Sequence, residues 1–301
     1  MTRADLELRL HLARTCDESV AALAEFFAAH DLVFGHGTDN ASDEAFWLLR
    51  HLQGWRDGVW DAPLDPALRS SAVELAVRRA MERKPLAYLT GEAWFAGLRF
   101  RVDERVLVPR SPLAEVIERG FEPWCAPRAG DRVLDIGTGS GCIAIAAAHY
   151  CPEVRVDATD VSPAALAVAA ANVALHGVGD RVRLLETDLF PAGRERYRVI
   201  VANPPYVPEA QLDEMPEEFG HEPRLALSGG ADGLRLAQRV LAGARRRLAP
   251  GGVLLLEVGG TAGALAAAYP NVPFTWLEFE RGGDGVCVFG ESELQAFPRG
   301  G

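Results

Sequence analysis

Hydrophobic positions in the first third of the chain recur every three to four residues. This spacing predicts amphipathic helices over residues 17–30 and 42–53. A third helix is expected to begin at Asp65, a favourable N-cap that is followed by proline, and to end before Pro85. Residues 1–86 are therefore predicted to form a small helical domain.

The pattern then changes to the alternation of apolar and polar residues that is typical of half-buried strands. Residues 92–108 alternate in this way on either side of a turn expected at Ala96 and Gly97. We interpret residues 87–110 as a β-hairpin linker.

From Asp131 onward, short apolar runs are separated by helical stretches. The runs are 133–134, 154–158, 182–185, 199–202, 253–258 and 274–279. Such alternation predicts an α/β domain, over residues 111–301, with a mostly parallel sheet. Residues 286–289 follow the preceding strand through a connection too short for a helix, so an antiparallel hairpin is expected there.

Length and charge narrow the functional classes. A chain of 301 residues with 49% hydrophobic residues can bury one large core and fold a smaller domain beside it. Its net charge of −11 disfavours a nucleic-acid phosphate backbone, so no direct DNA binding is expected. The sequence has neither an apolar run of membrane-spanning length nor the features of a secretory signal, which favours a cytoplasmic protein with no membrane contact.

Cysteine and histidine give no sign of a metal site. The five cysteines are scattered, form no C-x-x-C pair and are interpreted as reduced structural thiols. The seven histidines lack metal-ligand spacing. His221 alone lies near the candidate site described below, and we favour a hydrogen-bonding role in a loop over a role in proton removal.

The clearest ligand-binding pattern is the glycine-rich turn of residues 137–141, which follows the strand that ends at Ile136. Ligands of open α/β sheets bind at this edge, and glycines let the backbone approach them. The G-x-G-x-G spacing departs from a dinucleotide fingerprint because Cys142 stands where Gly or Ala is needed, and no Gly-Lys-Ser/Thr follows for a P-loop. The turn resembles the first motif of the seven-stranded methyltransferases, which implies that S-adenosylmethionine is the cofactor. In and beside this loop, the residues expected to bind the cofactor are Asp135, Gly137, Thr138, Gly139 and Gly141.

Two further carboxylates end the next two predicted strands. Asp160 can accept hydrogen bonds from both hydroxyls of a ribose, although it could instead cap the following helix, a role that Ser162 could also fill. Asp188 is expected at the edge of the adenine, with Leu189 or Phe190 against the adenine face, or else as a cap within its loop.

The fourth strand delivers Asn203-Pro204-Pro205-Tyr206, the most informative tetrapeptide of the chain. The prolines stiffen the backbone, so the Asn203 side-chain oxygen and a main-chain carbonyl, that of Pro204, could accept both hydrogens of an NH₂ group. Tyr206 could pack on the plane of that group. Because the motif contains no strong base, methylation of a planar amide or amino nitrogen would depend on geometry and on acceptors aimed at the NH₂.

Because these motifs follow one another in this order, the chain resembles the protein N5-glutamine methyltransferases over nearly its whole length. The matching segments are 85–88, 107–110, 133–141, 203–207, 222–227 and 229–234. The resemblance implies a seven-stranded Rossmann-like methyltransferase domain preceded by a helical substrate-recognition domain and a hairpin. It also implies that Gly137, Thr138, Gly139, Asp160 and Asn203 bind the cofactor, and that Asn203, Pro204, Pro205 and Tyr206 hold the glutamine.

Details within the family favour one branch. Pro109-Arg110-Ser111-Pro112 departs from the Pro-Arg-Pro of the release-factor enzymes, and residues 215–223 resemble the enzymes that modify protein three of the large ribosomal subunit. The expected substrate is therefore a glutamine of that ribosomal protein, with the release factors as the alternative. Adenine-N6 and cytosine-N4 DNA methyltransferases share an Asn/Asp-Pro-Pro-aromatic motif, but the negative charge of this chain disfavours them.

Six carboxylates follow the reactive motif within fourteen residues. They are Glu209, Asp213, Glu214, Glu217, Glu218 and Glu222. They could be ordinary solvated surface, or they could form an electronegative rim that attracts a basic ribosomal protein.

Overall fold

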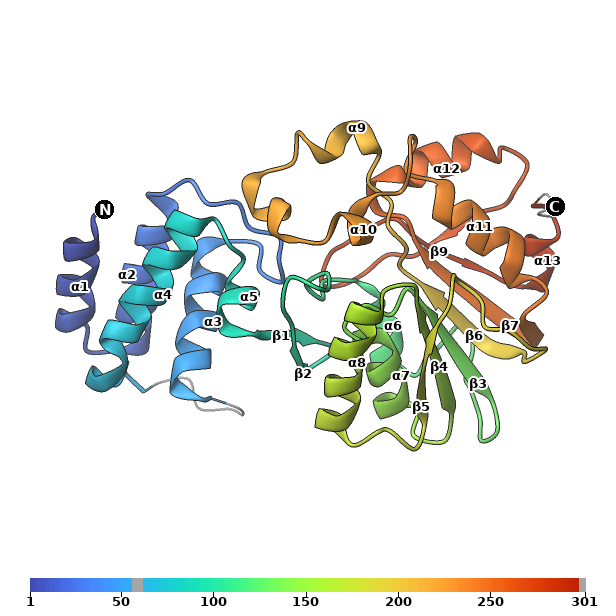
Figure 1. The fold of residues 1–301 in the computed structure, drawn as a ribbon, viewed down its shortest axis with the longest axis horizontal. Helices are drawn as coiled ribbons and strands as arrows, with labels where there is room; N and C mark the ends of the chain where they lie inside the picture. Colours follow the sequence, from blue (N-terminus) through green and yellow to red (C-terminus); the bar gives the residue numbers. More distant parts are fainter. Residues whose placement is uncertain (56–61, 298–301) are drawn as a thin grey trace. The chain divides into compact units, whose positions relative to one another are not determined.

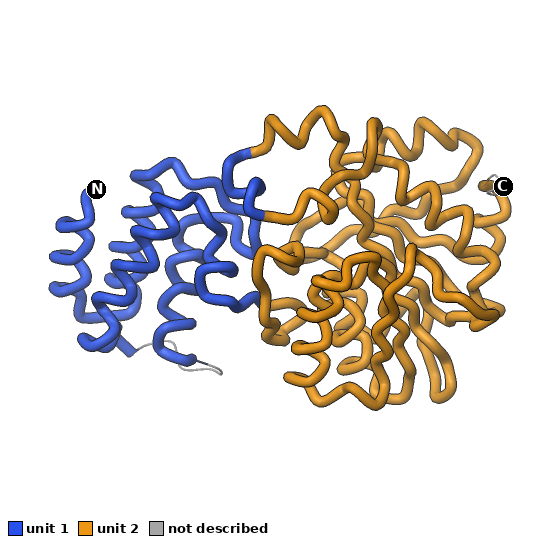
Figure 2. The backbone as a smooth tube through the Cα atoms, in the orientation of Figure 1, with its two compact units in different colours: residues 1–93, 216–221 blue, residues 94–215, 222–301 orange. Residues whose placement is uncertain are grey.

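The computed structural model describes residues 1–55 and 62–297 of the chain. Contacts divide the chain into two compact units, coloured separately in Figure 2. The helical unit comprises Met1–Ala93 together with Pro216–His221, and the sheet unit comprises Trp94–Met215 and Glu222–Gly301. The chain therefore returns to the helical unit for six residues soon after the Asn-Pro-Pro-Tyr motif.

The helical unit contains the helices that the sequence predicted. They are α2 (Cys16–Ala28) and α3 (Ala41–Gln53), with N-caps Thr15 and Asn40 whose side chains accept backbone N–H groups. The third predicted helix begins, as expected, with Asp65 as N-cap, but its first turn is the 3₁₀ helix η1 (Pro66–Leu68), which leads into α4 (Arg69–Glu82). The short helices α5 (Leu86–Thr90) and η2 (Glu217–His221) complete the unit together with α1 (Arg3–Leu12).

Helix α1 was not predicted from the sequence, for a physical reason. Only Leu6 and Leu10 of this helix are buried, whereas Leu8 and Leu12 are more than half exposed. Its hydrophobic stripe is therefore narrow. A capping box between Thr2 and Asp5 fixes its start instead, because each side chain accepts the other residue's backbone N–H.

A buried ionic cluster lies within the helical unit. Arg79 of α4 is fully buried, donates from Nε to Glu44, and donates from Nη2 to the carbonyl of Val33 at 2.9 Å. Glu218 of η2 is also fully buried, 3.4 Å from Arg79 Nη1 and 2.9 Å from Arg83 Nη2. The idea that Glu218 belongs to a solvated or attracting surface is therefore wrong, because this carboxylate is buried against the guanidinium groups of Arg79 and Arg83.

The predicted hairpin is confirmed. Strand β1 (Glu92–Phe95) pairs with β2 (Leu98–Arg101). Between the strands, Ala96 and Gly97 both have positive φ, 48° and 70°. Two consecutive positive φ values are typical of the turn that matches the twist of a two-residue hairpin.

The sheet unit is built on seven strands in the order β5-β4-β3-β6-β7-β9-β8. Their bounds are β3 (Arg132–Ile136), β4 (Arg155–Asp160), β5 (Val182–Glu186), β6 (Tyr197–Ala202), β7 (Leu248–Glu257), β8 (Thr275–Trp276) and β9 (Val286–Phe289). Strands β3 to β7 are parallel, and β9 runs antiparallel to both β7 and β8. This confirms the expected mostly parallel sheet and its terminal antiparallel hairpin.

Helices cover both faces of this sheet (Figure 1). On one face are α6 (Leu113–Glu118), α7 (Cys142–Tyr150) and α8 (Pro163–His176), and on the other are α11 (Arg235–Ala244), α12 (Ala262–Ala268) and α13 (Glu291–Leu294). Helix α11 buries Ala237, Val240, Leu241 and Ala244, one stripe at helical spacing, against strands β6 and β7. In the described part of the chain, no helix has the length and apolar character needed to cross a membrane.

Candidate active site

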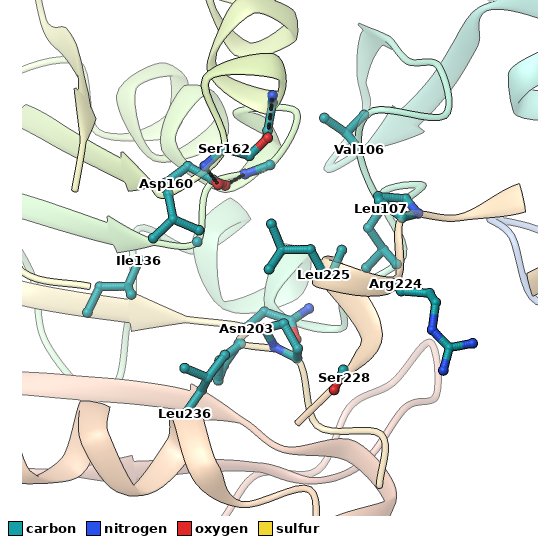
Figure 3. Close-up of a pocket in the computed structure, with 18 of the residues that line it drawn as sticks. Val106, Leu107, Ile136, Asp160, Ser162, Asn203, Arg224, Leu225, Ser228 and Leu236 are labelled. Atoms are coloured by element: carbon teal, nitrogen blue, oxygen red, sulfur yellow. Dashed lines mark hydrogen bonds between the residues drawn. The ribbon is translucent and has the colours of Figure 1, made fainter. Parts of the chain in front are cut away.

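A cavity of about 710 Å³ opens at the carboxyl ends of the parallel strands. This is the edge where open α/β sheets bind ligands. Its lining includes most of the predicted site residues, namely Gly137, Gly139, Asp160, Asp188, Leu189, Asn203, Pro204 and Pro205. Figure 3 shows Asp160 and Asn203 on different sides of this space, with Leu225 projecting between them.

Asp160 ties the glycine-rich loop to the end of β4. Its Oδ2 accepts the N–H of Gly139 and its Oδ1 accepts the N–H of Ser162, both at 2.9 Å. The cap of α8 is Ser162, whose hydroxyl accepts the N–H of Ala165 at 3.1 Å. Since the capping role belongs to Ser162, the remaining lone pairs of Asp160 are free for a ligand in the cavity that it lines.

The glycine loop itself needs a left-handed backbone. Gly137 and Gly139 have φ values of 73° and 54°, which side chains rarely adopt. The N–H groups of Gly137 and Thr138 both donate to the carbonyl of Thr159 at 2.9 Å, so the loop is held against β4.

Three residues that the sequence assigned to the cofactor do not line the cavity: Asp135, Thr138 and Gly141. Asp135 is buried beneath the loop, where Thr138 Oγ1 donates to its Oδ2 at 2.5 Å and Ala144 N at 3.1 Å. Burial raises the pKa of Asp135 to about 7. A Cβ on Gly141 would lie 3.2 Å from both Ala169 Cβ and Ile145 Cδ1, so this glycine allows α7 and α8 to pack closely. All three residues shape the loop from behind.

The end of β5 contributes Asp188 and Leu189. Asp188 lines the cavity and forms an ion pair of 2.7 Å with Arg239 of α11. Leu189, with φ of 65°, also lines the cavity, and its carbonyl accepts the hydroxyl of Thr159 at 2.8 Å. Phe190 does not line it, because its ring packs over Gly243 of α11. Of the two candidates for the adenine face, only Leu189 lines the cavity.

Beyond β6, the reactive motif is held by a second segment of the chain. Val207 N donates to Leu227 O, and Gly229 N donates to Val207 O, both at 2.9 Å. A Cβ on Gly233 would lie 2.3 Å from the carbonyl oxygen of Tyr206, so the backbone of the motif rests directly on this glycine. The family segments 222–227 and 229–234 thus support Asn-Pro-Pro-Tyr.

Tyr206 lies outside the cavity lining. Its ring packs against Gly259, where an added Cβ would approach two ring carbons to 2.7 Å. Burial raises the pKa of Tyr206 to about 12, so the phenol keeps its proton at neutral pH. Within the motif, Tyr206 therefore packs away from the cavity lining, and its stacking on a substrate amide stays a prediction.

The six carboxylates after the motif do not form one exposed rim, because two of them are buried. Glu222 is buried and accepts a two-point contact from Arg110, with distances of 2.9 and 2.6 Å, and the N–H of Val108 at 3.1 Å. Asp213 is exposed but is 2.8 Å from Arg224 Nη1. The interpretation of all six carboxylates as one surface is wrong, because two of them are interior anchors.

His221 belongs to the helical unit, where its Nε2 donates to the carbonyl of Glu82 at 2.9 Å. The hydrogen bond agrees with the expected structural role, but His221 ends the 3₁₀ helix η2 and does not lie in a loop. Among the residues that the structure describes, no group of three or more His, Cys, Asp or Glu side chains is arranged to hold a metal ion.

Several lining residues were not predicted from the sequence. They are Val106, Leu107, Arg224, Leu225, Ser228, Arg235 and Leu236. Leu107 and Leu225 lie inside segments that carried the family resemblance, so the signal was present. Sequence alone could not assign these two leucines to the cavity, because an apolar residue is compatible with a buried core position and with a ligand-facing position alike.

Comparison with known proteins agrees with this geometry. Residues 125–230 match the model of the methyltransferase small domain family. The ribosomal protein uL3 glutamine methyltransferase of Bordetella pertussis is 46% identical over 87% of this chain and 90% of its own length, and that of Neisseria meningitidis serogroup A is 46% identical over 84% and 85%.

Among solved structures, the catalytic domain of hMettl16 in complex with the MAT2A 3′UTR hairpin 6 has a similar fold, with a TM-score of 0.52. It is 16% identical over 73% of this chain and 81% of its own, so the likeness concerns the fold alone. The two curated relatives match at much higher identity and over most of both sequences. By that similarity, the chain belongs to the family of ribosomal protein uL3 glutamine methyltransferases.

Proposed function

We propose that this protein transfers a methyl group from S-adenosylmethionine to the N5 side-chain amide nitrogen of a glutamine in ribosomal protein uL3. The observation that carries the proposal is that Asn203, Pro204 and Pro205 line the same cavity as Gly139 and Asp160. The residues proposed to accept the NH₂ group and the loop proposed to bind the nucleoside therefore line one cavity.

The residues present fit the cofactor. Asp160 has lone pairs left for the ribose hydroxyls, and the loop of Gly137 and Gly139 leaves room for the amino-acid end. Leu189 offers an apolar contact for the adenine, and Asp188 offers an acceptor at its edge. When bound, the sulfonium of the cofactor supplies an electrophilic methyl group.

The chain's own contribution is to orient the glutamine. An amide nitrogen is a weak nucleophile because its lone pair is delocalised into the carbonyl group. Holding it in line with the methyl group can contribute several kcal/mol, and acceptors at Asn203 Oδ1 and the Pro204 carbonyl stabilise the positive charge that grows on the nitrogen. The proton becomes acidic only once the methyl has begun to transfer, so no strong base is needed early.

The choice of substrate follows from the relatives. Both relatives described above are named for uL3, and the segment 109–112 lacks the Pro-Arg-Pro of the release-factor branch. A net charge of −11 suits a basic ribosomal protein and opposes a DNA backbone. We therefore assign uL3 as the partner.

The test uses labelled S-adenosylmethionine with purified uL3, purified release factor and duplex DNA as parallel substrates. Mass spectrometry of the product should find one added methyl group on a glutamine side chain of uL3. Asn203→Ala should lower kcat at least a hundredfold, far more than it lowers cofactor affinity, because the reacting NH₂ loses an acceptor. Labelling of release factor or DNA in preference to uL3 would overturn the proposal.

A further inference from the structure

Residues 105–107, which line the cavity, belong to a segment that is fixed at both ends by buried side chains. The segment follows strand β2, which ends at Arg101. At its far end, the N–H of Val108 donates to buried Glu222 at 3.1 Å. At its near end, the backbone of Arg101 is bound by Asn172 of α8, a helix that packs against β2. The position of this cavity wall therefore depends on side chains outside it.

Asn172 has no exposed surface and uses both ends of its amide group. Its Oδ1 accepts the N–H of Arg101 at 2.8 Å, and its Nδ2 donates to the carbonyl of the same residue at 3.0 Å. Nδ2 also donates to the carbonyl of Ser140, in the glycine-rich loop, at 2.9 Å. An N–H group needs an acceptor and a carbonyl needs a donor, so these partners fix the orientation of the amide. One buried side chain thus joins β2 to the loop proposed to bind the cofactor.

Helix α8 contacts β2 at a second point, one turn further along. His176 Nε2 donates to the carbonyl of Arg99 at 2.8 Å. Residues 172 and 176 lie on the same face of the helix, because positions four apart are neighbours on a helix surface. Within the described ranges 1–55 and 62–297, His176 has no hydrogen bond to residues 137–141. His176 therefore shares the contact of Asn172 with the hairpin but not its link to the loop.

We propose that Asn172 is a positioning residue for methyl transfer, which makes the wall of residues 105–107 follow the conformation of the glycine-rich loop. The proposal rests on the proposed function. Once the loop is ordered around a bound cofactor, the carbonyl of Ser140 is fixed, and Asn172 passes that constraint to Arg101 and so to the wall. Asn172 does not line the cavity, so its effect passes entirely through the backbone groups that it binds.

The expected consequence is that the two ligands bind with positive coupling. The protein substrate meets a wall that is in place when the cofactor is bound, and it binds this form more tightly than the free protein. By linkage, each ligand then raises the affinity for the other by the same factor. Loss of the Asn172 contacts should reduce that factor.

Hydrogen exchange of the full chain, with and without S-adenosylhomocysteine, tests the link without turnover. In wild type, this ligand should slow amide exchange in residues 137–141 and also in residues 101–108. Asn172→Ala should keep the first effect and lose the second. His176→Ala, the matched control, should show both effects, because it removes a hairpin contact and leaves the bond to Ser140 in place.

Three results would overturn the proposal. One is protection of residues 101–108 that persists in Asn172→Ala, since the ligand would then act on the wall directly. Another is the same loss of protection in His176→Ala, since general packing of the hairpin would then be the cause. The third needs no variant: in wild type, S-adenosylhomocysteine protects residues 137–141 but not residues 101–108. Asn172→Ser, which is too short to reach both backbones, replaces Asn172→Ala if that variant does not fold.

Steady-state kinetics separates positioning from a loss of folded protein. Asn172→Ala should raise KM for uL3 roughly five- to tenfold and leave kcat within about twofold of wild type, because Asn203 and Pro204 are not displaced. A lower kcat with unchanged KM, the pattern of a smaller folded fraction, would contradict the positioning role.

The exchange measurement also keeps this inference distinct from the choice of substrate. If uL3 is not methylated but residues 101–108 are protected through Asn172, the proposed function fails and the link between loop and wall stands. If wild type methylates uL3 and its residues 101–108 are not protected, the positioning role of Asn172 fails alone.

Discussion

Asp160 contacts the glycine loop and, in the proposed function, also binds the ribose of the cofactor. Its carboxylate already accepts the N–H groups of Gly139 and Ser162. We expect Asp160→Ala to weaken S-adenosylmethionine binding roughly ten- to a hundredfold, which corresponds to the loss of a charge-assisted hydrogen bond worth about 1.5 to 3 kcal/mol. Isothermal titration calorimetry measures this directly.

The matched control is Asp160→Asn, which keeps one acceptor oxygen for the loop and should lose less affinity. Circular dichroism of both variants without cofactor should match wild type. Unchanged affinity in a folded Asp160→Ala protein would remove Asp160 from the ribose site.

The position of a site residue was predictable where the residue ends or directly follows a strand. Asp160 and Asn203 come after apolar runs, and the carboxyl ends of parallel strands meet at one edge, so their place at the cavity could be derived from order alone. Glu257 also ends a strand, but its place next to the end of β6 depends on β6 and β7 being neighbours in register. Nothing in the local sequence of either strand specifies that pairing.

At the scale of elements, the reactive motif depends on glycines that leave no room for a side chain. Gly259→Ala should displace the ring of Tyr206, because the new methyl would lie 2.7 Å from ring carbons, and φ is 46° there. We expect kcat/KM for the protein substrate to fall at least tenfold while cofactor affinity is retained, since Gly259 is remote from the glycine loop in sequence and lies outside the cavity lining.

Gly260→Ala is the control in the same short helix η3 (Gly259–Thr261). A Cβ at Gly260 meets no atom within 4 Å, so this variant should behave as wild type. Equal losses in both variants would mean that the helix backbone, rather than the position of Tyr206, limits activity.

The segment 216–221 supports the helical unit through one carboxylate. Burial alone would raise the pKa of Glu218. Four interactions outweigh burial and hold the pKa of this carboxyl below its ordinary value: the backbone N–H groups of Val33 and of Glu218 itself, and the charges of Arg83 and Arg79. Its stabilising contribution is therefore complete above pH 4.5, the ordinary value, and is lost as the pH falls through the lower pKa of the folded state.

Glu218→Gln should lower the free energy of unfolding of the helical unit by roughly 3 kcal/mol at neutral pH, the lower end of the range for breaking a buried ion pair, because Arg79 keeps its contact with Glu44. Hydrogen exchange of the α4 backbone measures this loss. Glu217→Gln, an exposed neighbour, should change stability by less than about 0.5 kcal/mol. The difference between Glu218→Gln and wild type should shrink in acid, and a difference that does not depend on pH would contradict the ionic origin.

Helices and strands were predictable where many of their residues are apolar and regularly spaced. The buried strands of the sheet and helices α2 and α3 carry continuous or periodic apolar residues, and all of them were expected. Strand β8 covers only Thr275–Trp276 of the six-residue run from 274 to 279, because pairing with β9 and not hydrophobicity sets its length. The return of 216–221 to the helical unit could not be predicted, since Glu218 and Arg79 are 139 positions apart.

At the scale of the whole molecule, the net charge is a better guide to the class of substrate than any local run of charged residues. The excess of 42 acidic over 31 basic residues gives −11 in total. Around the cavity, however, carboxylates face arginines: Asp188 with Arg239 at 2.7 Å and Asp213 with Arg224 at 2.8 Å. Within the acidic segment, Glu209 and Asp213 are exposed but lie 4.0 and 2.8 Å from arginines, and the other two exposed carboxylates are Glu214 and Glu217.

These two carboxylates allow a sharper test of electrostatic attraction than the full segment does. If the segment draws in a basic substrate, Glu214→Gln with Glu217→Gln should lower kcat/KM for uL3 and flatten its salt dependence, while saturated kcat and cofactor affinity stay near wild type. Substitution of Glu218 is excluded, because it would act through stability.

The control removes the same charge at the opposite edge of the sheet. Glu153 and Asp180 are exposed and precede β4 and β5, whereas the cavity lies at the carboxyl ends of the strands. Glu153→Gln with Asp180→Asn therefore changes net charge equally without touching the acidic segment. At physiological ionic strength, screening limits the range of interactions between exposed charges to about 8 to 10 Å. A local effect should therefore appear only in the Glu214→Gln, Glu217→Gln variant. Equal changes in both double variants, measured as kcat/KM against salt concentration, would show that overall charge governs the encounter; no change in either would assign substrate choice to contacts of the helical unit.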